Sequence, residues 1–221
     1  MDKYIVKVLK TDYVTHNVKH FVVETPPGYT FIPGQATDVS INKPGLENEL
    51  RPFTFTSYRT SDNLEFTIKI YTGHNGITEK LASINAGDEL ILHEVFGAIA
   101  YKGPGVFIAG GAGITPFIAI LKQLKQENNL AGNTLLFANR TESDIILWEE
   151  LNELLGDAFI NVLEKPLTPG TPPLRIDKQL LKAYITPNAH YYICGPDKFT
   201  IAMVTYLQEL GVAPSQIIIE E

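Results

Sequence analysis

Hydrophobic and polar residues alternate through the first hundred positions of the chain. Six runs rich in β-branched and aromatic residues lie at 4–10, 18–25, 36–41, 51–58, 64–71 and 88–96. Turn sequences such as TPPG, NKPG and NAGD separate these runs. Short strands at this spacing predict an antiparallel β-barrel or sandwich. The stretch 76–84 has a helical period instead, with Leu81 and Ile84 on one face.

The pattern changes its period after YKGPG at 101–105. Continuous apolar runs at 105–110, 134–140, 158–164, 191–196 and 216–220 are typical of buried parallel strands. Helical patterns lie between them, at 115–128, 143–156, 176–185 and 197–211. Strands that alternate with helices predict a doubly wound parallel sheet. We therefore expect two domains, a β-barrel over residues 1–101 and an α/β domain over residues 102–221.

Composition narrows the possible functions. The chain has 221 residues, of which 44% are hydrophobic and 19% charged, enough for a packed core. A net charge of −7 without a Lys/Arg cluster argues against nucleic acid as a partner. The absence of a long apolar run or signal-peptide core argues against membrane insertion. Cys194 is the single cysteine, so no disulfide or iron–sulfur centre is expected within this chain, and a reducing cytoplasm is expected. The five histidines lack metal-ligand spacing, so no metal is expected.

The segment FIAGGAGITPFIAIL, residues 107–121, joins the first apolar run of the second half to a helix. Gly110, Gly111 and Gly113 end the strand, Thr115 is expected to cap the helix, and Pro116 suits its first turn. A helix N-terminus that is open to the solvent binds phosphate. The dinucleotide fingerprint is incomplete, because Pro116 stands at its third glycine. Taken alone, the segment fits a phosphate site and a packing turn equally well.

Three further segments place chemistry-bearing residues near strand ends. RPFTFTSY (51–58) could set Arg51, Phe53 and Thr54 along one ligand, or form an edge strand with an exposed arginine. IKIYTGHNGITEKL (68–81) starts a helix at 76–78, which suits an anion or an ordinary crossover. YYICGPDKF (191–199) puts Cys194 at the carboxyl end of a strand, where ligands gather, although a buried cysteine is more often a small hydrophobe.

Together these segments resemble the ferredoxin–NADP⁺ reductase superfamily along nearly the whole chain. RPFTFTS looks like that family's flavin motif, and GHNGITEKL looks like its flavin pyrophosphate motif. GGAGITP is similar to its nicotinamide-dinucleotide motif, and CGP to its nicotinamide-proximal motif. The resemblance implies a flavin-binding β-barrel followed by an NAD(P)-binding α/β domain.

The resemblance also implies roles for individual residues. Arg51 would pair with the flavin phosphate, Phe53 would pack on the isoalloxazine, and Thr54 would offer its hydroxyl to flavin N5. The implied cofactor is FAD rather than FMN, because the pyrophosphate motif is present. The further residues expected at the flavin are Pro52, Lys69, Ile70, Tyr71, Gly76, Ile77 and Thr78, the last three through their backbone donors.

NAD(P)H is the implied second ligand. Gly110, Gly111, Gly113, Thr115 and Pro116 would shape its site, and Cys194, Gly195 and Pro196 would flank the nicotinamide. Thr54 and Cys194 are thus the residues expected at the hydride path, with Cys194 as a positioning residue.

The choice between the two coenzymes depends on two residues. Arg140 could meet a 2′-phosphate, whereas Glu164 could accept a ribose 2′-hydroxyl and repel that phosphate, which favours NADH. Many family members end in an aromatic residue over the flavin, but this sequence ends in IIIEE. We therefore expect either Glu220 or Glu221 near the site, or a flavin face that is open to a partner.

The resemblance implies an FAD-dependent reductase that accepts hydride from NAD(P)H and passes electrons to a separate carrier such as ferredoxin or flavodoxin. Such carriers are usually acidic, so an acidic reductase would need a local basic patch, for which Lys3, Lys7, Lys10 and Lys19 are candidates. Two alternatives stay open: an NAD(P)H flavin reductase that acts on free flavin, and a non-catalytic flavin-binding subunit of a larger electron-transfer complex.

Overall fold

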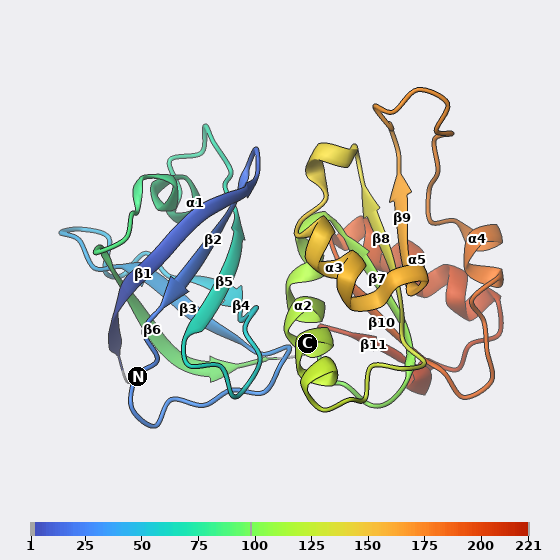
Figure 1. Ribbon diagram of the computed structural model, residues 1–221, viewed down its shortest axis with the longest axis horizontal. Helices are drawn as coiled ribbons and strands as arrows, with labels where there is room; N and C mark the ends of the chain where they lie inside the picture. Colours follow the sequence, from blue (N-terminus) through green and yellow to red (C-terminus); the bar gives the residue numbers. More distant parts are fainter. Residues whose placement is uncertain (1–2, 98, 221) are drawn as a thin grey trace.

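Two β-sheets lie side by side in the chain, one in each half (Figure 1). The structure is a computed structural model that describes residues 3–97 and 99–220. An antiparallel sheet of six strands comes first, and a parallel sheet of five strands follows. This arrangement confirms the fold class expected from the change of hydrophobic period.

The first sheet closes into a barrel. Its strands are β1 (Tyr4–Thr15), β2 (Val18–Val23), β3 (Ala36–Ile41), β4 (Arg51–Thr54), β5 (Leu64–Lys69) and β6 (Glu89–Phe96), in the order β4-β3-β6-β1-β2-β5. The chain just after β4 then meets β5: Phe55 bridges Phe66, and the Thr56 N–H donates to the Glu65 carbonyl at 2.8 Å. The two edge strands of the sheet, β4 and β5, are thereby joined. The sheet is therefore a closed barrel and not a sandwich.

Aromatic rings fill the barrel. The Phe55 ring is fully buried, and its centroid lies 4.3 Å from that of Phe31 and 5.1 Å from that of Phe66. The short helix α1 (Ile77–Lys80) and the 3₁₀ turn η1 (Leu81–Ser83) pack Ile77 and Leu81 into the same core. The predicted helix at 76–84 is therefore present as these two short pieces.

The second sheet is parallel and has helices on both faces. Its strands are β7 (Gly105–Gly110), β8 (Thr134–Asn139), β9 (Phe159–Leu163), β10 (His190–Cys194) and β11 (Ile217–Ile219), in the order β11-β10-β7-β8-β9. Helices α2 (Thr115–Gln126) and α3 (Trp148–Leu155) cover one face, while α4 (Lys178–Lys182) and α5 (Asp197–Glu209) cover the other (Figure 1). From β7 the chain adds β8 and β9 on one side, and it later adds β10 and β11 on the other side of β7. The order of strand addition therefore reverses between β7 and β10, while all five strands stay parallel.

The helix expected over 143–156 is shorter than predicted. Residues Glu142–Asp144 form a 3₁₀ turn, and α3 begins only at Trp148. Asp144 accepts hydrogen bonds from the backbone N–H and the hydroxyl of Thr141, at 3.0 and 2.6 Å, which holds the turn apart from the helix. Ile145 and Ile146, which lie between the two pieces, are both buried. Burial of apolar side chains between the two pieces thus overrides the helical period.

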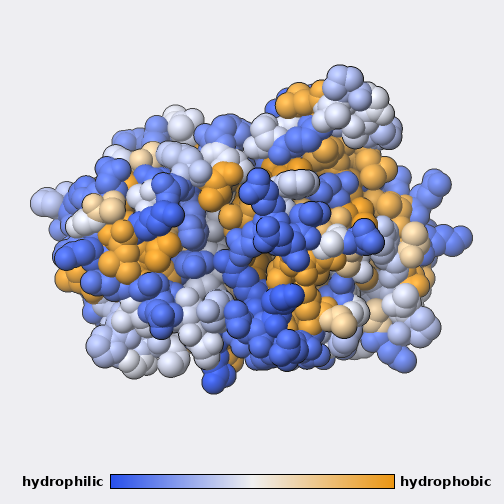
Figure 2. All heavy atoms as spheres, in the orientation of Figure 1, coloured by the Kyte–Doolittle hydropathy of each residue, from blue (hydrophilic) through white to orange (hydrophobic). Residues whose placement is uncertain are grey.

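The barrel packs against the α/β half through the tip of its first hairpin. Val18 belongs to the apolar core under α2, and Ile99 from the connecting segment joins it there. Gly34, with a φ of +98°, lies so close to this segment that an added Cβ would stand 2.2 Å from the Ile99 carbonyl oxygen. The connection between β6 and β7 contains the expected division at 101/102, which stays a prediction. Figure 2 shows hydrophilic residues over much of the surface, with apolar residues exposed on both halves.

Candidate functional site

A cleft of about 1000 Å³ runs between the barrel and the carboxyl ends of the parallel strands. The barrel contributes predicted residues of β4, of the end of β5 and of the segment that follows it, and the α/β half contributes the glycine turn and the end of β10. The predicted residues that line the cleft are Pro52, Phe53, Thr54, Lys69, Tyr71, Thr78, Gly110, Gly111, Gly113, Thr115, Arg140, Glu164, Cys194, Gly195 and Pro196. Residues from all four sequence motifs therefore meet at one cavity. It lies at the point where the strand order of the parallel sheet reverses, between β7 and β10.

The glycine turn is in direct backbone contact with the end of β10. A Cβ added to Gly113 would stand 2.3 Å from the Cys194 carbonyl oxygen and 2.6 Å from the Gly195 nitrogen. Any larger residue would therefore push β10 away from the turn. Gly113 thus serves packing, which was one of the two readings of this segment, and its packing brings the GGAGITP and CGP motifs together.

Gly111 is needed for its backbone conformation rather than for packing. Its φ is +54°, a conformation that residues with a Cβ rarely adopt, and an added Cβ would meet no atom within 4 Å. The 3₁₀ turn Gly111–Ile114 runs directly into α2, and Gly111, Ala112 and Gly113 line the cleft, so the N-terminus of this continuous helical segment lies at the cleft. The expectation that Thr115 caps the helix is wrong, because Thr115 lies inside α2 and its hydroxyl donates to the Ala112 carbonyl at 3.2 Å.

Cys194 and Glu220 form a polar pair at the floor of the cleft. The Cys194 thiol donates to Glu220 Oε2 at 3.5 Å. Burial raises the pKa of the Cys194 thiol to about 12, and the Glu220 carboxylate adds to the rise. A thiol in this state is protonated near neutral pH and is no nucleophile, which agrees with a positioning role. Of the two terminal glutamates, Glu220 reaches the cleft and Glu221 lies outside the described residues.

A carboxylate and two guanidinium groups, from Glu164, Arg140 and Arg175, also line the cleft. Glu164 follows β9, Arg140 follows β8, and backbone bonds tie the two segments, with Lys165 N–H donating to the Arg140 carbonyl at 2.7 Å. Arg175, which the sequence motifs did not indicate, reaches over from the segment before α4 and forms an ion pair with Glu164. The carboxylate that was expected to repel a phosphate is thus partly neutralised by its own arginine.

The loop before α1 binds the carboxylate of Glu79, a residue of α1. The backbone N–H groups of Gly73, His74 and Asn75 donate to the Glu79 carboxylate at 3.0, 3.1 and 2.6 Å. These bonds lower the pKa of Glu79, so it is an anion near neutral pH. They order the loop and leave Thr78 at the wall of the cleft.

Five predicted site residues do not line the cleft: Arg51, Ile70, Gly76, Ile77 and Pro116. Arg51 is exposed, and its guanidinium donates to the neighbouring Leu50 carbonyl at 2.7 Å. The side chains of Ile70 and Ile77 are turned into the barrel core, because an apolar side chain next to a strand end is better buried there than in a polar cleft. Their roles toward a cofactor stay predictions.

Several cleft residues were not indicated by the sequence motifs. Asn139, at the end of β8, is 7% exposed, and neither its amide nitrogen nor its oxygen has a hydrogen-bond partner among the described residues. Phe199 packs on Gly110 and Gly195. Asn139 stands at the carboxyl end of a predicted parallel strand, and this position was the signal that could have found it. Arg175 gave no such signal, because it comes from an irregular segment.

The expected basic patch is wrong in one of its members. Lys19 is buried, and its ammonium donates to the carbonyls of Ala82 and Ile84 at 2.9 and 2.6 Å. Lys10 pairs with Asp12 at 3.3 Å. Lys19 therefore stabilises the end of η1 instead of facing a partner.

The α/β wall of the cleft has features that suit a phosphate-bearing ligand. They are the positive φ of Gly111 with open space beside it, the helix N-terminus that follows it, and the amide of Asn139, which has no hydrogen-bond partner among the described residues. Among the helices of the described ranges 3–97 and 99–220, none has the length and apolar character that a bilayer crossing requires.

Known proteins resemble this chain in its second half and along most of its length. Residues 107–205 match the family described as the oxidoreductase NAD-binding domain. The reductase component of propane 2-monooxygenase from Rhodococcus jostii is 31% identical over an alignment of 212 positions, gaps included, which covers 87% of this chain and 55% of that protein. NADH–cytochrome b5 reductase 1 from Arabidopsis thaliana is 27% identical over an alignment of 228 positions, which covers 94% of this chain and 80% of that protein. The chain thus spans little more than half the length of the monooxygenase reductase.

Solved structures show the same architecture. The ferredoxin NADP⁺ reductase of Neisseria gonorrhoeae, solved with bound FAD and NADP, superposes with a TM-score of 0.84 at 21% identity and 99% and 98% coverage of the two chains. The FAD/NAD-binding domain of nitric oxide dioxygenase from Vibrio cholerae gives a TM-score of 0.86 at 22% identity, with the same coverage. The chain therefore has the two-domain ferredoxin–NADP⁺ reductase fold, and residues 107–205 in its second half are similar to the oxidoreductase NAD-binding domain family.

Proposed function

We propose that this chain is an FAD-dependent reductase that takes hydride from NAD(P)H and passes the electrons to a separate carrier protein. The observation that supports this most is the single cleft in which Phe53 and Thr54 of the barrel face the Gly111 turn and Cys194 of the NAD-binding half. One ligand on each wall would bring two dinucleotides into contact. When bound, the flavin supplies the chemistry, because it takes up two electrons as hydride and can release them one at a time.

In this proposal the residues of the chain bind the two dinucleotides and orient them toward each other. Thr54 offers a hydroxyl at the barrel wall, and the N–H groups of the glycine turn bind phosphate. Cys194 and Glu220 fill the floor beside the proposed nicotinamide position and keep a protonated thiol there. No nucleophile or acid–base group is required of the chain in this proposal, because the two bound ligands would supply the reacting atoms.

NADH is the coenzyme that we propose. Glu164 lines the cleft and would accept a ribose 2′-hydroxyl, and one relative, 27% identical, is named as an NADH–cytochrome b5 reductase. Arg175 and Arg140 weaken the repulsion of a 2′-phosphate, so the proposed preference over NADPH is modest.

The acceptor is proposed to be a small electron-carrier protein such as ferredoxin or flavodoxin. The names of the relatives support a protein acceptor, since one is the reductase component of a monooxygenase and another a cytochrome b5 reductase. We propose the reducing cytoplasm as the compartment, in keeping with the lone thiol.

The test is an anaerobic titration of the purified, FAD-reconstituted protein with NADH, followed by flavin absorbance. We expect FAD to stay bound through gel filtration and to bleach on addition of NADH, and the reduced protein to reoxidise with ferredoxin or flavodoxin. Bound flavin that does not bleach with either coenzyme would overturn the proposal. Flavin that is reduced but released on each turnover would favour a flavin reductase that acts on free flavin.

A further inference from the structure

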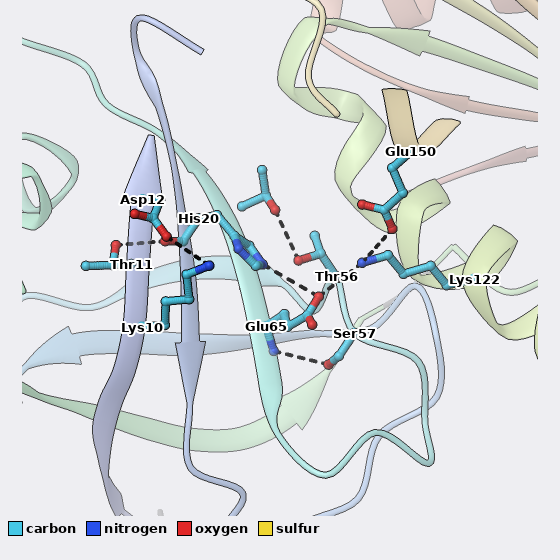
Figure 3. Close-up of polar contacts among 10 residues, drawn as sticks. Lys10, Thr11, Asp12, His20, Thr56, Ser57, Glu65, Lys122 and Glu150 are labelled. Carbon is cyan, nitrogen blue, oxygen red and sulfur yellow. Dashed lines mark hydrogen bonds and ion pairs between the residues drawn. The ribbon is translucent and has the colours of Figure 1, made fainter. Parts of the chain in front are cut away.

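A chain of charged side chains crosses the junction between the two halves, behind the cleft. Lys122 of α2 places its ammonium 3.1 Å from Glu65 of β5 and 3.1 Å from Glu150 of α3 (Figure 3). His20 of β2 lies on the other side of Glu65, with its Nε2 3.6 Å from the same carboxylate. Glu65 belongs to the barrel and Glu150 to the α/β half, so Lys122 makes one ion pair across the junction and one within its own half.

The ion pair across the junction is largely shielded from water. The side chain of Lys122 is 18% exposed and that of Glu65 is 23% exposed. Burial alone would lower the pKa of Lys122, but the two carboxylates outweigh it and raise the pKa. Burial would likewise raise the pKa of Glu65, but His20 and Lys122 lower it instead. Both groups are therefore charged near neutral pH. Removal of Glu65 would leave Lys122 with Glu150 alone, and removal of Lys122 would leave the half-buried Glu65 with His20 alone.

Two kinds of contact join the halves. Directional polar contacts are the Glu65–Lys122 pair, the Arg59 N–H that donates to Gln123 Oε1 at 2.9 Å, and His16 Nε2 at 3.8 Å from Asp144 Oδ1, and of these Glu65–Lys122 is the charge pair between Lys and Glu. The apolar contacts specify no angle by themselves. Val18 and Ile99 pack on the core under α2, and this attraction depends on buried area rather than on direction. A hydrogen-bonded ion pair has a defined geometry, and polar pairs of this kind select one arrangement among several that bury similar area. The Glu65–Lys122 pair has the position and the directionality to make that selection.

Both partners lie on elements that also form the cleft. Two residues beyond Glu65, β5 reaches Thr67, and the strand then continues to Lys69 at the cleft wall. Lys122 lies two helical turns beyond Thr115, about 10 Å along the helix axis. A rotation of one half about this pair would therefore change the distance between the two walls of the cleft.

We propose that Lys122 is a positioning residue, which sets the angle between the barrel and the α/β half through Glu65 and thereby the approach of the two dinucleotides. The inference rests on the proposed function for its kinetic consequence. Its structural part is that the Glu65–Lys122 pair holds the two halves at a single angle. This part does not depend on the proposed function and can be tested without any cofactor.

The cofactor-free test compares Glu65→Gln with Glu150→Gln. Both substitutions remove one carboxylate charge from Lys122, but only Glu65→Gln breaks the pair across the junction. Nitroxide labels on Ser83→Cys and Gln208→Cys, both at exposed positions, in a Cys194→Ser background, report the distance between the halves by pulsed electron resonance. We expect one narrow distribution for the parent and for Glu150→Gln, and a broader or shifted one for Glu65→Gln. Equal distributions in the two variants would overturn the inference.

The kinetic test uses the FAD-loaded protein and stopped-flow reduction by NADH, with the native Cys194 in place. We expect Glu65→Gln and Lys122→Met to lower the limiting rate of flavin reduction about tenfold, because a misplacement near 1 Å is enough for such a loss. The NADH dissociation constant should change less than about twofold, and Lys122→Arg should restore most of the rate. An unchanged rate in Glu65→Gln, or an equal loss in Glu150→Gln, would contradict the positioning role. A parent protein that shows no reduction would refute the proposed function instead, and the label distances would still decide the inference.

Discussion

The contact between Gly113 and the end of β10 offers the sharpest test of how the cleft is built. In Gly113→Ala, the new Cβ would stand 2.3 Å from the Cys194 carbonyl oxygen, whereas ordinary contacts begin at 3.4 Å. Backbone on one side must therefore retreat by about 1 Å, since neither partner is the end of a flexible side chain. Overpacking of this kind costs about 1–3 kcal/mol, and alanine returns up to about 1 kcal/mol through the unfolded chain.

The net loss expected for Gly113→Ala is about 2 kcal/mol, or a fall in Tm of about 4–8 °C for a chain of this length. Urea unfolding followed by tryptophan fluorescence measures it, because Trp148 is the single tryptophan and lies in the α/β half. Alkylation of Cys194 should also accelerate, since the displaced strand exposes the thiol.

Gly111→Ala serves as the matched control. Its Cβ would meet no atom within 4 Å, but its φ of +54° makes alanine strained by about 1–2 kcal/mol. We expect a loss of stability without faster alkylation of Cys194. If Gly113→Ala keeps the parental Tm and thiol reactivity, backbone contact does not couple the two motifs and the reasoning fails.

Three further changes follow from the same structure. Glu164→Gln should raise kcat/KM for NADPH relative to NADH about tenfold, since it removes a carboxylate and frees Arg175; an unchanged ratio would contradict the proposed role of Glu164. Lys19→Met should lower stability by about 1–3 kcal/mol and weaken FAD retention, because the carbonyls of Ala82 and Ile84 lose their buried donor; calorimetry checks the first and gel filtration the second. Alkylation of Cys194 should stay slow up to about pH 10, because the pKa of its thiol is raised to about 12. The stability that the protonated thiol contributes should be present below about pH 9 and disappear as the pH rises toward 12, which unfolding measured at several pH values checks. Fast alkylation at pH 8 would show that the thiol is not shielded.

The order of strands and helices could be predicted from the sequence alone. The periods of two and 3.6 residues depend on which face of each element meets the core, and that information is local. The four motifs lie at strand ends for the same reason, because glycine, proline and capping residues mark where a strand turns into a helix. Where local signals competed with burial, as at Ile146, the prediction of a helix from 143 was wrong.

Contacts between distant segments could not be predicted in this way. Barrel closure depends on the bridge between Phe55 and Phe66, and the meeting of Gly113 with Cys194 depends on strands that are neighbours only in the folded sheet. Arg175 reaches Glu164 from an irregular segment, and Lys19 is buried because the end of η1 needs a donor. The sequence by itself determined the two halves and the residues capable of binding. The tertiary structure alone decided which of them share a cleft, because that depends on packing and charge pairing between elements far apart along the chain.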